Sequence, residues 1–227
     1  MATAVALLVA AGRGERLGHG RPKALVPCAG RPLMAWSLAA LQSVEAITHV
    51  VAALPPGVAA PHGVLGVGGG AQRSHSVRAA LHAAPASEWV LVHDAARPML
   101  TPAIVQACLR ALGGEGCDAA IAAAPVADTI KESAGDVVVR TLDRSHLWAI
   151  QTPQAFRRDV LERALGLSDA ALAAATDDAS LVESFGGEVR LVPTTPQNFK
   201  VTTPEDLHLA ELILRDRLGR DQGDRAR

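Results

Sequence analysis

Uninterrupted apolar runs constrain the fold of this 227-residue chain more strongly than any other feature. The segments 4–9 and 119–124 hold no polar side chain, whereas a strand with one face in water would alternate apolar and polar residues. Both faces of such strands are therefore expected to lie beneath helices. Strand-like runs are expected near residues 4–10, 47–54, 63–67, 88–93, 119–124 and 188–193.

Helical periodicity separates these runs. Val77, Ala80, Leu81 and Ala84 recur at the spacing i, i+3, i+4, i+7, and residues 105–112 repeat it. Strands that alternate with helices predict an α/β fold, built as a doubly wound, mostly parallel and Rossmann-like sheet. Ligands of such sheets bind beyond the carboxyl ends of the strands, so we expect the chemistry there.

The first strand leads into a glycine-containing loop, which reads LLVAAGRGERL from Leu7 to Leu17. Small residues let backbone N–H groups approach phosphates closely, while Arg16 and Lys23 can neutralise a triphosphate. The loop matches neither the P-loop pattern nor the dinucleotide fingerprint, whose third glycine would fall one position before Gly18. The residues therefore indicate a phosphate site of another type.

Three further stretches narrow this interpretation: VHDAARP at 92–98, APVADTIK at 124–131 and NFKVTTPEDL at 198–207. Together with the first loop, and in this order, they resemble the 2-C-methyl-D-erythritol 4-phosphate cytidylyltransferase family. These are CTP-using nucleotidyltransferases of the non-mevalonate isoprenoid pathway. The resemblance runs from about residue 4 to about residue 215.

The resemblance implies transfer of CMP from CTP to 2-C-methyl-D-erythritol 4-phosphate, with release of pyrophosphate and with Mg²⁺ on the triphosphate. Arg16 and Lys23 would stabilise the pentacoordinate α-phosphorus, and such chemistry needs positioning and charge rather than a covalent nucleophile. The acceptor phosphate is already anionic, so no general base is required. The residues implied to bind CTP are Ala10, Ala11, Gly12, Arg13, Gly14, Gly69, Gly70, Ser76, Asp94 and Ala95.

A second glycine loop, at 68–77, is implied to recognise the cytosine ring. Gly70 and Ser76 match the family pattern, whereas Ala71 stands where several relatives carry an acid. Asp94 follows a strand and is the candidate Mg²⁺ ligand, because this ion favours one or two carboxylates plus phosphate oxygens. A local ion pair with Arg97 is the alternative role for Asp94, and the two roles are compatible.

A hairpin arm is expected at 126–148, with its turn near Gly135. An isolated hairpin is only marginally stable, so it needs something to pack against. The resemblance implies a homodimer in which each arm brings Thr129 and Arg144 to its neighbour's site. The residues implied to hold the acceptor are Arg97, Thr129, Arg144, Thr152 and Lys200, and the catalytic set is Arg16, Lys23, Arg144 and Lys200.

Composition bounds the partners and the compartment. A net charge of −1 gives no long-range attraction to nucleic acid or to acidic membranes. No basic leader with a cleavage site opens the chain, and its three cysteines lack disulfide or metal spacing, which predicts a cytoplasmic protein. We expect one domain over 1–227, a last helix capped by Thr203, and a flexible charged tail at 219–227.

Three rivals share part of this pattern. A ribitol 5-phosphate cytidylyltransferase has the same motifs and differs around the acceptor. Nucleotidyltransferases that use purine or uridine triphosphates favour a differently built first loop and lack the 198–207 pattern. A non-catalytic nucleotide-binding module is expected to have lost Arg16 or Lys23, and both are present here.

Overall fold

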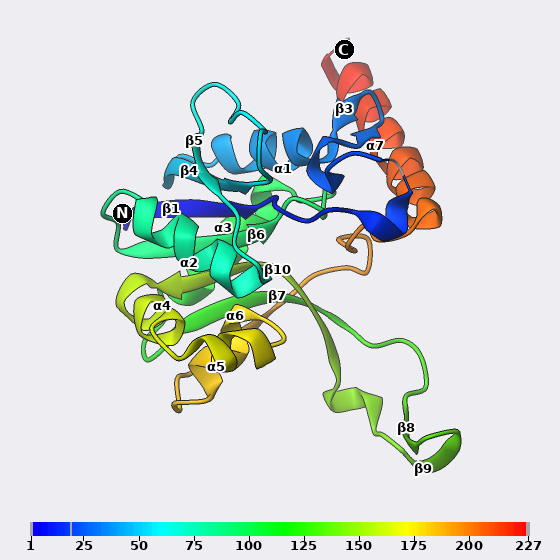
Figure 1. Ribbon diagram of the computed structural model, residues 1–227. Coiled ribbons are helices and arrows are strands. Elements are labelled where there is room, and N and C mark those ends of the chain that lie inside the picture. Colours follow the sequence, from blue (N-terminus) through cyan, green and yellow to red (C-terminus); the bar gives the residue numbers. More distant parts are fainter. Residues whose placement is uncertain (1, 19, 226–227) are drawn as a thin grey trace.

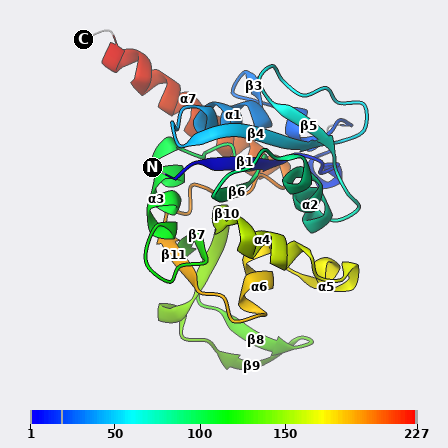
Figure 2. The ribbon, with the colours of Figure 1, turned by 90° about the vertical axis from the view of Figure 1, so that its left-hand side faces the viewer.

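A single large sheet forms the centre of the protein. The computed structural model describes residues 2–18 and 20–225, and seven strands follow the order β11-β7-β10-β6-β1-β4-β5 (Figures 1 and 2). Their bounds are β1 Ala4–Val9, β4 Ile47–Leu54, β5 Leu65–Gly68, β6 Trp89–Asp94, β7 Ala119–Pro125, β10 Trp148–Arg157 and β11 Val189–Pro193. Neighbours pair in parallel except where β10 runs antiparallel to β6 and β7. The expected mostly parallel α/β sheet is confirmed.

Helices cover both faces of this sheet. In Figure 2, α3 lies on one side of the strands, and α2, α4 and α5 lie on the other. The bounds are α1 Leu33–Gln42, α2 Arg73–Ala83, α3 Pro102–Leu112, α4 Arg158–Leu165, α5 Asp169–Ala174, α6 Asp178–Glu183 and α7 Pro204–Arg225. Two 3₁₀ helices, η1 Glu15–Leu17 and η2 Lys23–Leu25, and a small β2–β3 hairpin (Pro27–Cys28, Arg31–Pro32) precede α1.

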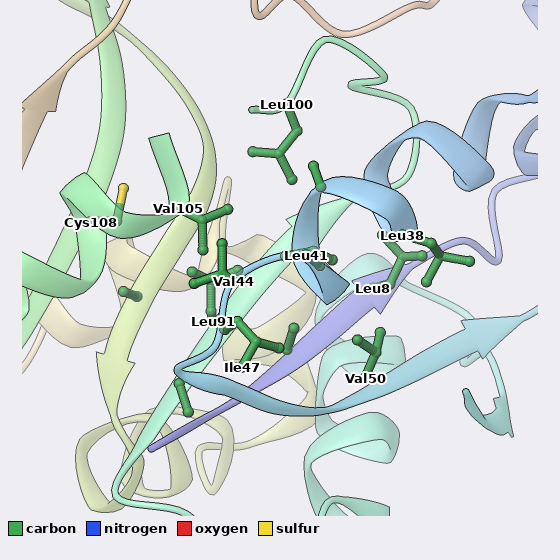
Figure 3. Close-up of a cluster of buried hydrophobic side chains, with 14 of the residues drawn as sticks. Leu8, Leu38, Leu41, Val44, Ile47, Val50, Leu91, Leu100, Val105 and Cys108 are labelled. Atoms are coloured by element: carbon green, nitrogen blue, oxygen red, sulfur yellow. The ribbon is translucent and has the colours of Figure 1, made fainter. Parts of the chain in front are cut away.

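The alternation of side chains along β1 explains why both faces need helices. Ala4, Ala6 and Leu8 belong to the buried cluster that holds α1 and α3 (Figure 3). Val5 and Leu7 belong to the cluster that holds α2, α4 and α6. Successive strand residues point to opposite faces, so an apolar run can stay dry only beneath two helical layers.

The hairpin arm projects away from the body (Figures 1 and 2). It consists of β8 (Lys131–Ala134) and β9 (Val137–Thr141), joined at Gly135 with φ +62°, and every residue of both strands is exposed. The residues at 137–139 are valines, between 56% and 65% exposed. The expected hairpin is confirmed, and it carries apolar surface that its own chain leaves in water.

Strand β10 was not predicted from the sequence. It begins at the base of the arm and ends inside the sheet, where Phe156 is fully buried. Pro153 and two glutamines interrupt its apolar pattern, and proline is rare in central strands. The pairing with β7 accordingly shifts between Ile150 and Gln154.

The last helix, α7, begins as expected. The Asp206 amide donates to the Thr203 hydroxyl at 3.3 Å, while the Thr203 amide donates to the Asp206 carboxylate at 2.9 Å. The helix continues to Arg225 and so includes most of the expected tail at 219–227; its flexibility stays a prediction, and 226–227 lie outside the described residues. Among the described helices, none is both long and apolar enough to span a membrane.

Candidate active site

A cavity of about 380 Å³ opens beyond the carboxyl ends of β1 and β6. Lys23 and Lys200 reach it from distant parts of the sequence, and Asp94 lies on its wall. The lining residues are Val9, Ala10, Ala11, Gly12, Arg13, Lys23, Ala24, Gly70, Ala71, Gln72, Arg73, Ser76, Asp94, Ala95, Ala96 and Lys200. Most residues that the resemblance implies for CTP therefore meet at one cavity.

The first glycine loop folds Lys23 back towards β1. The Lys23 amide donates to the Gly12 carbonyl at 3.2 Å. Gly14 adopts φ +73°, and a Cβ there would lie 2.8 Å from the Lys23 Cβ, so glycine is required by both conformation and space. Arg16 lies exposed on η1, outside the described cavity lining, but its positive charge contributes to lowering the Lys23 pKa.

The second glycine loop is locked from both sides. A Cβ on Gly69 would lie 2.1 Å from the Ala11 Cβ, so the two loops touch only because residue 69 has no side chain. The Ser76 hydroxyl accepts from the Gly70 amide at 3.0 Å and donates to the Gln72 carbonyl at 3.2 Å. Ser76 thus shapes the loop.

Asp94 lies in a cluster of charges rather than in a pair with Arg97. Arg73 Nε donates to its Oδ1 at 2.9 Å, and Lys200 Nζ donates to its Oδ2 at 2.8 Å. Arg73 Nη1 also binds the buried Asp178 at 2.7 Å. Burial alone would raise the pKa of Asp94, but Arg73 and Lys200 hold that pKa well below its ordinary value.

The local Asp94–Arg97 ion pair suggested by the sequence is not formed. The Arg97 guanidinium instead donates to the backbone carbonyls of Asn198, at 2.9 Å, and Ile150, at 3.4 Å. Arg97 therefore ties the loop after β6 to β10 and to the segment before α7. Its sequence neighbourhood could not reveal these partners, because both are backbone atoms of distant segments.

A second cavity, of about 410 Å³, adjoins the first and shares Arg73, Asp94 and Lys200 with it. Two other residues implied for the acceptor, Arg97 and Thr152, also line it. Other polar side chains along its wall are Gln151, Gln154, Thr176, Asp177, Ser180 and Glu183. Two cavities that meet at one charge cluster can hold two anionic substrates side by side.

Thr129 and Arg144 lie elsewhere. Both are exposed on the arm and are absent from the described linings of the two cavities. Arg144 donates to the Ala127 carbonyl within the arm. One chain therefore brings Arg97, Thr152 and Lys200 together at the second cavity and leaves the other two implied acceptor residues on the arm.

His93 positions the loop and has no free nitrogen for proton transfer. Its Nε2 faces the Arg97 carbonyl at 3.3 Å, so this nitrogen carries the proton and Nδ1 must accept from the Thr152 hydroxyl at 3.0 Å. The Thr152 oxygen in turn accepts from the Asp94 amide at 3.0 Å. Burial lowers the pKa of His93 to about 4, so the ring is neutral.

Replacing Thr152 by Val is expected to destabilise the protein by about 1–3 kcal/mol, because the buried Asp94 amide and His93 Nδ1 lose their partner. Unfolding in urea measures this difference. Thr152→Ser keeps the hydroxyl, and we expect it to cost less than Thr152→Val. A larger loss in Thr152→Ser than in Thr152→Val would show that the methyl group, which valine keeps, matters more than the hydrogen bonds.

Lys23 has an altered acidity with a consequence for pH dependence. Burial, and then the charge of Lys200, lower its pKa to about 8 against the attraction of Asp94. The ammonium is present below that pH and lost above it, so kcat/KM for CTP is expected to fall above about pH 8. A profile of kcat/KM against pH tests this. Lys23→Arg should shift the alkaline decline to higher pH, and an unshifted decline would assign it to another group.

The site suits a metal ion that arrives with its ligand. Within the described residues no three His, Cys, Asp or Glu side chains are grouped to hold a metal. Asp94 offers the cavity one carboxylate, whose oxygens are engaged by Arg73 and by the 43% exposed Lys200. One carboxylate fits Mg²⁺ carried on a triphosphate, which supplies further oxygens, but not a metal held by protein alone.

Comparison with known proteins places this geometry in a family. The family model IspD, 2-C-methyl-D-erythritol 4-phosphate cytidylyltransferase, matches residues 4–216. Enzymes of that name from Frankia casuarinae and Deinococcus radiodurans are each 48% identical, over 92% of this chain and 80% and 88% of theirs. The crystal structure of the Thermus thermophilus enzyme, 37% identical, superposes with a TM-score of 0.80 over 94% of this chain and all of that one. The chain therefore belongs to the 2-C-methyl-D-erythritol 4-phosphate cytidylyltransferase family.

Proposed function

We propose that this protein transfers CMP from CTP to 2-C-methyl-D-erythritol 4-phosphate and releases pyrophosphate, a step of isoprenoid precursor biosynthesis. The observation that carries the proposal is the junction of two cavities at Arg73, Asp94 and Lys200, beside a glycine loop that presents Lys23. Family membership supports the identities of the two substrates.

The two cavities divide the work. The first cavity takes CTP, with the backbone of residues 10–14 along the phosphates and the turn at 69–71 beside the cytosine ring. The second takes the acceptor, whose phosphate oxygen attacks the α-phosphorus. The new bond joins these two atoms, and the bond between the α-phosphorus and the oxygen bridging to the β-phosphorus breaks. Lys23 and Arg16 offset the negative charge on the leaving pyrophosphate.

Lys200 lies where two anions must approach each other. At about 4 Å, two like charges repel by roughly 1 kcal/mol in water and by several kcal/mol in a site shielded from water. The Lys200 ammonium is shared by both cavities and can neutralise the acceptor phosphate as it nears the triphosphate. Mg²⁺, for which Asp94 is the candidate ligand, supplies further charge neutralisation to the triphosphate when bound.

The arm supports a proposal about assembly. Val137, Val138 and Val139 are more than half exposed, and Thr129 and Arg144 lie on the same projection. We propose a homodimer in which each arm packs against the partner and brings Thr129 and Arg144 to the partner's second cavity. Packing there would cover the valines and add a guanidinium for the acceptor phosphate.

We also propose that the enzyme acts in the cytoplasm. Cys28, Cys108 and Cys117 are all free and buried, which suits a reducing compartment. Burial raises the pKa of the Cys28 thiol to about 11 and that of Cys108 to about 12, so neither is a reactive thiolate at neutral pH.

Pyrophosphate release tests the function directly. The purified protein is given Mg²⁺ and CTP with either 2-C-methyl-D-erythritol 4-phosphate or ribitol 5-phosphate. Release with the first acceptor alone is expected. Release with the second acceptor alone would identify a ribitol 5-phosphate cytidylyltransferase. CTP binding without pyrophosphate release in either case would point to a non-catalytic nucleotide-binding module.

A further inference from the structure

Asp178 is a buried carboxylate at the start of α6 that touches neither substrate cavity. Its side chain is fully buried, next to Ala179 and Val182 of an apolar cluster. Its Oδ2 accepts from Arg73 Nη1 at 2.7 Å, and its Oδ1 has no partner among the described residues. A carboxylate in such surroundings depends on its single cationic partner.

Arg73 turns this contact into a link between α6 and the active site. Its Nη1 binds Asp178 while its Nε binds Asp94, so one guanidinium bridges two carboxylates from different elements. The guanidinium is planar, and two bonds in different directions fix its orientation as well as its position. Burial alone would lower the pKa of Arg73, but Asp178 and Asp94 raise it, so the guanidinium is charged. Burial raises the pKa of Asp178, and the Arg73 guanidinium 2.7 Å away opposes that rise, so the charge of this carboxylate depends on Arg73.

Asp94 passes the constraint on to Lys200. Its Oδ1 is held by Arg73, which leaves Oδ2 directed at Lys200 Nζ, 2.8 Å away. The side chain of Lys200 is 43% exposed, so packing restrains it little and this ion pair restrains it more. Three links therefore run from the interior of α6 to the ammonium at the junction of the two cavities.

The charge on Asp178 is not needed to pack α6. Burying an ion pair costs desolvation that its attraction offsets only in part, and apolar side chains of similar size often serve stability equally well. The helix start is already capped by the neighbouring Asp177, which accepts from the Ser180 amide at 2.9 Å. What the Asp178 charge adds is a fixed orientation of Arg73.

We propose that Asp178 is a positioning residue for CMP transfer: by holding Arg73 it fixes the Asp94 carboxylate and, through it, the Lys200 ammonium between the two cavities. The inference rests on the proposed function. Asp178→Asn removes the charge at nearly constant shape and weakens the hold on Nη1 of the Arg73 guanidinium. A small displacement of groups around reacting phosphates can slow transfer by up to about 100-fold.

Steady-state kinetics of the full-length enzyme test the proposal. Asp178→Asn is expected to lower kcat/KM for the acceptor at least about 10-fold, while KM for CTP changes much less. The decisive comparison repeats the substitution in an Arg73→Ala background, where Asp178 has nothing left to position. There we expect no further loss. Wild-type kinetics in Asp178→Asn, or an equal loss in both backgrounds, would overturn the proposal.

Controls separate this role from folding and from the function itself. Asp169→Asn removes a carboxylate that is 72% exposed on the neighbouring helix α5, and we expect unchanged kinetics. Arg73→Lys keeps the positive charge but loses the planar guanidinium that binds both carboxylates. It should therefore lower kcat/KM for the acceptor as Asp178→Asn does, and it serves as the test if Asp178→Asn does not fold. Normal turnover in Arg73→Lys would overturn the proposal. Turnover by the wild-type enzyme tests the proposed function separately.

Discussion

Replacing Lys23 by Ala is expected to lower kcat for CMP transfer by about 100- to 1000-fold, the usual effect of removing one group that stabilises a developing charge. Lys23 lies on the wall of the first cavity, where charge moves onto the leaving pyrophosphate. Affinity for CTP should fall far less, since Lys200 and the loop amides still face that cavity. Single-turnover rates and calorimetric titration with CTP separate the two effects.

Two companion variants give this result its meaning. Lys23→Arg keeps the charge and should retain more activity than Lys23→Ala. Arg21→Ala removes an exposed cation two residues before Lys23 that lies outside the described lining of the cavity, and it should cost much less. Equal effects of Lys23→Ala and Arg21→Ala would reduce the role of Lys23 to general electrostatics of the loop.

Replacing Arg144 by Ala is expected to raise KM for the acceptor by about 10- to 100-fold, the range for a lost hydrogen bond to a charged group. The stronger test is to mix Arg144→Ala with Lys23→Ala subunits. With arms exchanged between subunits, a mixed dimer has one site that contains both side chains. Random pairing at equal amounts should restore about one quarter of wild-type activity.

The mixing experiment is measured at acceptor concentrations well below KM, where Arg144→Ala homodimers turn over slowly. Subunits must be co-expressed or refolded together, so that mixed dimers form. Sedimentation of the wild-type protein at micromolar concentration should show a dimer. Restoration shows that Arg144 acts on the partner's site, whereas a mixture no more active than its components would mean that each arm serves its own chain.

Six strands of the central sheet could be predicted because each is a short, largely apolar run, and their alternation with helices in the chain implied the parallel sheet. The seventh, β10, could not, because it combines Pro153 and two glutamines with its apolar residues. Those polar side chains are stabilised by partners remote in sequence: Gln151 binds the carbonyl of Thr195 and the side chain of Asn198. Tertiary contacts, which a local pattern does not contain, decide such a strand.

The active site, too, could be predicted only in part from the sequence. Lys23, Asp94 and Lys200 stand in recognisable motifs, and the fold brings all three to one cavity. The roles of Arg73 and Asp178 were missed, because nothing in either segment signals that the two side chains meet. A run of Asp-Asp before an apolar helix resembles an ordinary helix start. Only the burial of the second carboxylate distinguishes it from the first.

Strand β10 joins the arm to the wall of the second cavity without a hinge, since Ile150, Gln151 and Thr152 line that cavity a few residues beyond the arm. With arms exchanged as proposed, subunit association and acceptor binding share one coupling free energy. Whatever factor the partner's arm adds to acceptor affinity, the acceptor adds to the affinity of the subunits for each other. Dilution of the enzyme would then raise the apparent KM for the acceptor, as a competitive inhibitor does, and a higher concentration of acceptor would reverse the effect.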